Sequence, residues 1–147
     1  MRWRFVDRID RWEPWRSIAV RKAISLEEYS VLDRFGRRGV FPESLAIEIC
    51  VQAGRWLAVR SSEFRSLALL AGLSALRFEG EAGMGDVLVA RLAVTSRDDR
   101  GFEATGDVSA GERRIAAGAF AFELADLGVY DDPDLTRGWW RELHGAA

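Results

Sequence analysis

The segment from Glu43 to Val59, ESLAIEICVQAGRWLAV, limits the possible folds of this chain more than any other stretch. It follows Pro42, contains good helix formers, and has too many apolar residues to fit on one stripe of a helix. A helix that is apolar on nearly every side must be buried on most of them. We therefore expect this helix at the centre of the molecule, with the rest of the chain wrapped around it.

Several other segments show the alternation of apolar and other residues that is typical of β-strands. They are residues 17–25, 73–78, 86–97, 101–110 and 112–125. A short apolar piece, ended by Gly72, comes before the second of them. The last three are separated by the turn-prone sequences DDRG and AGE, a spacing that favours antiparallel hairpins. The pattern predicts an α+β fold in which an antiparallel sheet wraps around one long central helix.

Length and composition narrow the class of protein further. A chain of 147 residues fits one domain, and a formal net charge of −2 argues against nucleic acid as the main partner. The sequence shows no secretory signal and no run long enough to span a bilayer, so we expect a cytoplasmic protein. Cys50 is the single cysteine and lies among apolar residues, which favours a role as core filler. Nothing in the sequence supports a metal site.

Three stretches together resemble a known family. They are FVDRIDRWEPWRSIAVRKAIS, VFPESLAIEICVQAG and LLAGLSALRFEGEAGMGDVL. The whole match keeps a consistent order and runs from about Phe5 to about Leu124. They are similar to the opening strands, the glutamate-bearing helix and the Gly-Asp signature of the hotdog-fold 3-hydroxyacyl-(acyl-carrier-protein) dehydratases of FabZ type. The resemblance implies a single hotdog domain over residues 1–147, with residues 125–147 as a C-terminal extension.

The resemblance also implies a site. In the family a histidine takes the proton alpha to the thioester, and a helix carboxylate from the opposite subunit handles the leaving hydroxyl. The carboxylate falls on Glu48, and Gln52, at the family's glutamine position, is a candidate for binding substrate. The histidine and its following phenylalanine fall on Arg34 and Phe35. An arginine stays protonated at physiological pH and cannot act as a general base. Glu48 is therefore the candidate catalytic residue, and the histidine is missing.

Two of these assignments keep an alternative. Glu48 is either a general acid lining the acyl pocket or half of a structural ion pair with Arg34. Arg34, Arg37 and Arg38, with Phe35 between them, are candidates for binding substrate, through the phosphate of phosphopantetheine or an acidic acyl carrier protein. The alternative for these arginines is ordinary solvated surface charge. No cofactor is expected beyond the phosphopantetheine that carries the substrate.

Three functions are compatible with the resemblance. The first is a dehydratase-like subunit for 3-hydroxyacyl thioesters of fatty-acid or polyketide-type synthesis, paired with a histidine-bearing hotdog paralogue. The second is a non-catalytic scaffold that binds acyl carrier protein, and the third is a hotdog thioesterase in which Glu48 activates water. A dimer formed through sheet edges, with a paralogue or with a second copy, is expected because unpaired edge strands invite association.

The C-terminal tail, YDDPDLTRGWWRELHGAA, predicts one more helix. Asp132 suits the N-cap and Pro133 the first turn. Three apolar residues recur on one face of this helix: Leu135, Trp139 and Leu143. A helix this short is not stable alone. Its two tryptophans therefore imply that it docks onto the body of the protein or onto a partner. His144 is expected to be a solvated terminal residue.

Overall fold

The computed structural model describes residues 4–25 and 40–145. Its elements are β1 (Arg8–Glu13), β2 (Ser17–Ala23), α2 (Glu43–Ser61), β3 (Ser66–Phe78), β4 (Val87–Arg97), β5 (Gly101–Ala110), β6 (Arg113–Asp126), α3 (Leu127–Tyr130) and α4 (Pro133–His144). The predicted central helix and the strands near 17–25, 86–97, 101–110 and 112–125 are all present. The candidate residues Arg34, Phe35, Arg37 and Arg38 lie outside the described residues.

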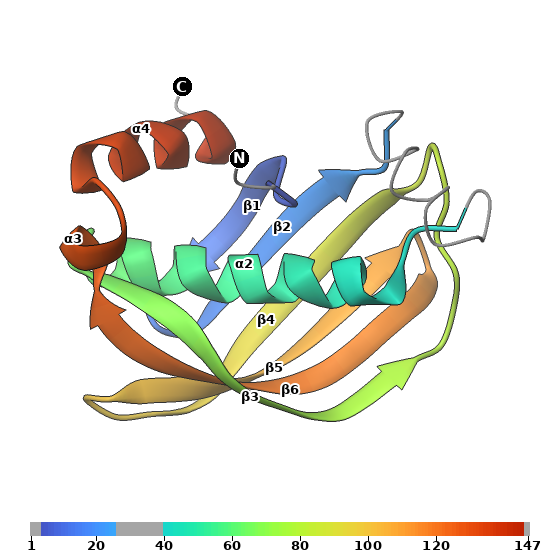
Figure 1. The fold of residues 1–147 in the computed structure, drawn as a ribbon. Helices are drawn as coiled ribbons and strands as arrows, with labels where there is room; N and C mark the ends of the chain where they lie inside the picture. The colour runs from blue at the N-terminus through green and yellow to red at the C-terminus, as the bar shows by residue number, and fades with distance from the viewer. Residues whose placement is uncertain (1–3, 26–39, 146–147) are drawn as a thin grey trace.

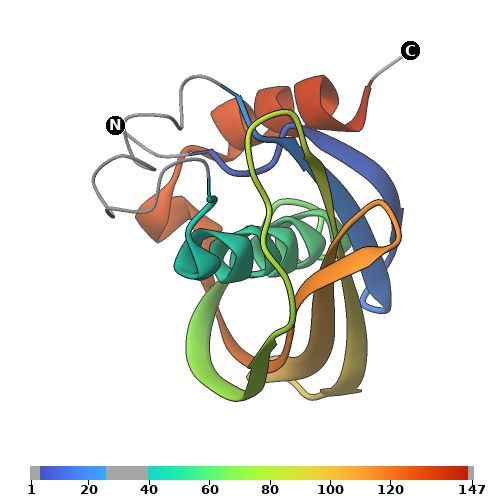
Figure 2. The same ribbon diagram turned by 90° about the vertical axis from the view of Figure 1, so that its right-hand side faces the viewer.

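The strands form one six-stranded sheet in the order β1-β2-β4-β5-β6-β3, and every neighbouring pair is antiparallel. The sheet curves around α2, from β3 on one side of the helix to β1 on the other (Figures 1 and 2). This confirms the expected α+β architecture with a sheet wrapped around a long helix. The curvature leaves one side of α2 uncovered by strands, and α4 lies over that side (Figure 1).

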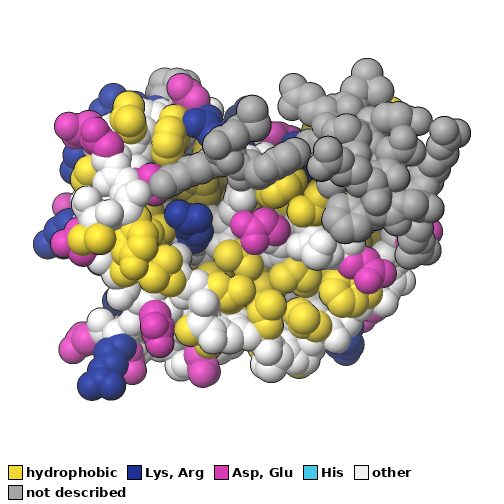
Figure 3. Space-filling model, viewed as in Figure 1, with side chains coloured by type: hydrophobic (Ala, Val, Ile, Leu, Met, Phe, Trp, Pro, Cys, Tyr) yellow, Lys and Arg dark blue, Asp and Glu magenta, His cyan; other side chains and the backbone are white. Residues whose placement is uncertain are grey.

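The two segments that Gly72 separates in the sequence form a single strand, β3. The register against β6 shifts between Leu70 and Gly72, so a β-bulge accommodates the glycine and the strand continues past it. β3 is an edge strand, and it carries large apolar side chains that are exposed: Leu70, Leu73, Leu76 and Phe78. Hydrophobic side chains gather on the face of the molecule over α2 and β3 (Figure 3).

The core lies between α2 and the concave face of the sheet. Helix and sheet approach each other closely at Gly54, where a Cβ atom would overlap the ring of Phe122. Phe122 is itself buried and stacks on Phe102 at 4.8 Å and on Phe120 at 6.3 Å between ring centroids. A side chain at position 54 would therefore push α2 away from the sheet.

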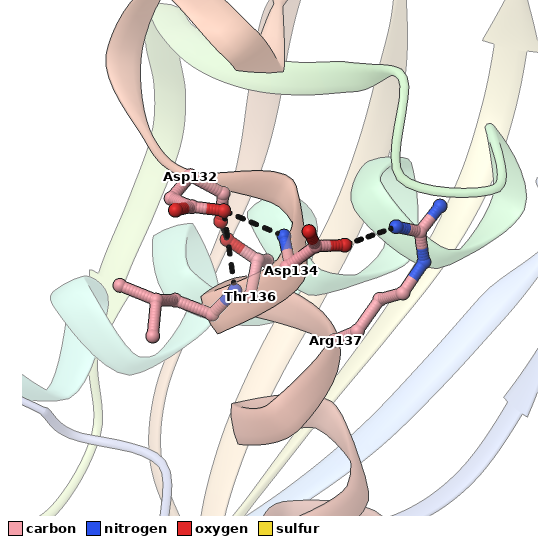
Figure 4. Close-up of polar contacts among 5 residues, drawn as sticks. Asp132, Asp134, Thr136 and Arg137 are labelled. Carbon is pink, nitrogen blue, oxygen red and sulfur yellow. Dashed lines mark hydrogen bonds and ion pairs between the residues drawn. The ribbon is translucent and has the colours of Figure 1, made fainter.

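Helix α4 begins as the sequence predicts. The Asp132 side chain accepts hydrogen bonds from the backbone N–H groups of Asp134 (2.8 Å) and Leu135 (3.4 Å), and Pro133 is the first helical residue (Figure 4). The Thr136 hydroxyl donates to the Asp132 carbonyl at 2.8 Å. Arg137 and Asp134 form an ion pair at 3.0 Å, one turn apart on the outer surface.

The predicted apolar face of α4 is correct for Leu143, which is buried, and wrong for Leu135. The buried side chains are Thr136, Trp140 and Leu143, whereas Leu135 is 59% exposed. The reason is that Trp140 fits between two other tryptophans, edge-on to Trp12 at 5.4 Å and tilted against Trp56 at 6.1 Å. Packing of this large ring sets the rotation of the helix. Of the two predicted alternatives, docking onto the body or onto a partner, the structure shows the first.

Among residues 4–25 and 40–145, no helix combines the length and the apolar character that crossing a membrane requires.

Candidate functional site

A cavity of about 990 Å³ lies on the side of α2 that the sheet leaves uncovered. Helix α2 supplies one wall, which includes Glu48, Gln52, Arg55 and Trp56. The facing wall comes from the α3–α4 region and includes Leu127, Thr136, Trp139 and Leu143. Phe5 and Val6, just before β1, close a third side. This is the size and the largely apolar character of a site for a small organic ligand.

Glu48 and Gln52 lie together in this cavity. They are one helical turn apart on α2, and Gln52 Nε2 donates a hydrogen bond to Glu48 Oε1 at 3.3 Å. Gln52 Oε1 in turn accepts from the backbone N–H of Phe5 at 2.9 Å, which fixes the orientation of the amide. Among the described residues, Glu48 Oε2 makes no hydrogen bond or ion pair. One carboxylate oxygen is thus held by the protein, while the other is left for a ligand or water.

The cavity explains how a carboxylate is tolerated within an apolar helix. Glu48 is half-buried, whereas Ile47 and Ile49 on either side of it are buried in the core. The helix turns by about 100° per residue, so Glu48 faces the cavity while its neighbours face the sheet. The predicted alternative, an ion pair with Arg34, involves a residue outside the described part of the chain.

Charged residues hold the cavity walls together. Arg55 on α2 reaches Asp131, just before α4, at 3.9 Å. The guanidinium of Arg4 lies over the ring of Trp139, 4.5 Å from its centroid, and 3.9 Å from Glu142. Sequence reasoning missed Arg55, Asp131 and Arg4. The spacing of Arg55 from Glu48, two helical turns along one face of α2, is the one signal that could have found any of them.

Cys50 has the environment of an inert core thiol. Burial, with a smaller effect from the negative charge of Asp107, raises the pKa of Cys50 to about 12. A thiol with such a pKa stays protonated at neutral pH and is a poor nucleophile. The expectation that this cysteine fills the core is confirmed.

The remaining sequence predictions about sites concern histidine and metals. His144 is exposed, as predicted, and its ring stacks on Trp140 with 5.2 Å between centroids. Within the described ranges, no group of three or more histidine, cysteine, aspartate or glutamate side chains is arranged to hold a metal ion.

Comparison with solved structures defines the class of protein: this chain has the hotdog fold. A chain of the dehydratase heterocomplex ApeI:P from Xenorhabdus doucetiae superposes with a TM-score of 0.65 at 19% identity, covering 92% of this chain and 88% of that one. A hypothetical thioesterase from Streptococcus pneumoniae with coenzyme A superposes with a TM-score of 0.64 at 12% identity, covering 80% of this chain and 84% of the other. The fold expected from the resemblance is confirmed.

In sequence, the chain is similar to FabZ dehydratases. It is 25% identical over 122 residues to the 3-hydroxyacyl-(acyl-carrier-protein) dehydratase FabZ of Clostridium kluyveri. The aligned region covers 82% of this chain and 85% of that protein. No family model matches the chain. The sequence relatives are thus FabZ dehydratases, and the solved structures establish the fold.

Proposed function

We propose that this chain is a dehydratase-like subunit that binds carrier-bound 3-hydroxyacyl thioesters and supplies the carboxylate, Glu48, for loss of water. The observation that carries the proposal is the position of Glu48: held by Gln52 and facing a cavity of about 990 Å³. The similarity to FabZ of Clostridium kluyveri supports the choice of reaction.

Loss of water from a 3-hydroxyacyl thioester needs two groups. A base removes the proton on the carbon alpha to the thioester, the bond from the beta carbon to its hydroxyl oxygen breaks, and that oxygen leaves as water after taking a proton. In this proposal Glu48 gives that proton. The hydrogen bond from Gln52 engages one carboxylate oxygen, and the other oxygen would carry the proton that is given to the leaving hydroxyl.

The base comes from a second hotdog chain. The position of the family's histidine is occupied by Arg34, whose guanidinium does not lose a proton at neutral pH. A partner that carries the histidine would complete the site across a dimer interface. The dehydratase heterocomplex among the fold relatives supports this arrangement, and the apolar edge strand β3 offers a surface for it. Arg34, Arg37 and Arg38 are proposed to bind the phosphopantetheine phosphate or the carrier protein.

The test is a dehydration assay on the chain alone and on its complex with a histidine-bearing hotdog homologue. The isolated chain is expected to give little or no enoyl thioester, and the complex is expected to be active. In the complex, Glu48→Gln should lower the rate by about 10²- to 10⁴-fold, the usual value of general acid–base catalysis. Glu43→Gln is the matched control, because Glu43 is exposed on the same helix and does not line the cavity.

Two results would refute this assignment. One is robust turnover by the isolated chain that survives Glu48→Gln, and the other is an equal loss of activity in Glu43→Gln.

The second candidate function is thioester hydrolysis, which the fold relatives described as thioesterases favour. In that case Glu48 would activate water, and the assay would release free thiol without forming an enoyl product.

A further inference from the structure

The two adjacent tryptophans of α4 have different surroundings. Trp140 is 7% exposed and packs against Trp12 and Trp56 in the core. Trp139 is half-buried, lines the cavity, and lies under the guanidinium of Arg4. Successive residues of a helix point about 100° apart, so one ring anchors the helix while the other faces the cavity.

The same helix supplies further cavity residues. Thr136 and Leu143 stand one turn before and one turn after Trp139, and all three line the space that Glu48 faces from α2. Helix α4 is held in this place at both ends: by the ion pair between Arg55 and Asp131 near its start, and by Trp140 towards its end. The wall opposite Glu48 is therefore a largely apolar surface, anchored to the core by Trp140.

We infer that α4 sets the length of acyl chain that this protein accepts, with Trp139 as the specificity-determining residue. The inference rests on the proposed function, because it assigns the cavity to the acyl chain of the thioester. An acyl chain whose thioester end lies near Glu48 extends along an apolar wall, and the indole of Trp139 occupies volume that a longer chain would need. The cation–π contact with Arg4 restrains this ring.

Binding of a series of acyl thioesters tests the inference without requiring catalysis. The probes are S-acyl N-acetylcysteamine thioesters from butanoyl to dodecanoyl, titrated calorimetrically into the wild-type chain, Trp139→Phe and Trp139→Ala. Each methylene that enters the cavity should raise the affinity about fourfold, because a buried CH₂ is worth about 0.8 kcal/mol and about 1.4 kcal/mol is tenfold. For the wild type the increase should stop at a certain chain length.

In Trp139→Ala the increase should continue to longer chains, so that the longest thioester binds at least about tenfold more tightly than to the wild type. Trp139→Phe should fall between the two, and it keeps the test valid if the alanine variant folds poorly. Leu135→Ala is the matched control, because Leu135 is exposed on the same helix and does not line the cavity.

Two results overturn the inference while leaving the proposed function intact. One is a dependence on chain length that is the same in the wild type and both Trp139 variants, and the other is an equal shift in Leu135→Ala. If none of the thioesters binds to any variant, the proposed function fails as well, so the two failures are distinguishable.

Discussion

The tight approach of α2 to the sheet predicts the effect of adding one methyl group at Gly54. Alanine is normally better than glycine within a helix by about 1 kcal/mol. At Gly54 the new methyl would overlap the ring of Phe122, which cannot easily move because Phe102 and Phe120 stack against it. Overpacking of this kind costs about 1–3 kcal/mol. We expect Gly54→Ala to lower the free energy of unfolding by a net amount of about 0–2 kcal/mol.

Gly138 provides the matched control within the same chain. It lies inside α4, and a Cβ atom there would meet nothing within 4 Å. Gly138→Ala should therefore raise the free energy of unfolding by about 1 kcal/mol, the full difference in helix propensity. Urea denaturation followed by circular dichroism gives both values if the slope with denaturant is unchanged. A Gly54→Ala variant as stable as Gly138→Ala would refute the close packing of α2 against Phe122.

Three further perturbations have expected outcomes. Asp132→Ala removes the cap of α4 and should lower the free energy of unfolding, measured by urea denaturation, by about 0.5–2 kcal/mol. Asp132→Asn should lower it by almost nothing, and equal effects of the two variants would argue against the capping role. Trp140→Ala should destabilise the fold by about 3–5 kcal/mol and Trp139→Ala by clearly less, since only Trp140 is packed in the core; the reverse order of melting temperatures would contradict this. The pKa of Cys50 is about 12 in the folded chain, whereas an ordinary thiol has a pKa near 9.0. The contribution of the protonated, buried Cys50 to stability is therefore complete below pH 9 and is lost as the pH rises towards 12. The wild type should therefore lose up to about 1.4 kcal/mol more per pH unit over that interval than Cys50→Ala, and parallel pH profiles would count against the burial of the thiol.

The sequence was most informative where structure is set by local periodicity. The apolar character of residues 43–59 identified α2, because burial on most sides leaves few polar positions. Strands β4, β5 and β6 were identified by alternation, and their observed bounds differ from the predicted ones by a residue or so. The N-cap of α4 was also found, since an aspartate followed by proline is a local signal.

Features that depend on side chains from distant parts of the chain could not be predicted. The rotation of α4 is decided by Trp140 packing against Trp12 and Trp56, which lie far from it in sequence. For the same reason no sequence pattern indicated that the C-terminal extension lines the cavity. The positions of Glu48 and Gln52 were implied by the family resemblance, and one helical turn joins them. Arg55 and Asp131, in contrast, meet only through the tertiary fold.

The position of β3 in the sheet has a consequence for biosynthesis. Among the strands of the described residues, β3 pairs with β6 alone, and its first residue, Ser66, lies opposite Asp126. At a synthesis rate of about 5–20 residues per second, β3 waits roughly several seconds on the ribosome before its partner strand is complete. During that time its leucines and Phe78 are exposed in a strand with no neighbour on either side. Nascent chains that stop before β6 should therefore aggregate or recruit chaperones, whereas chains that stop after Asp126 have a paired β3.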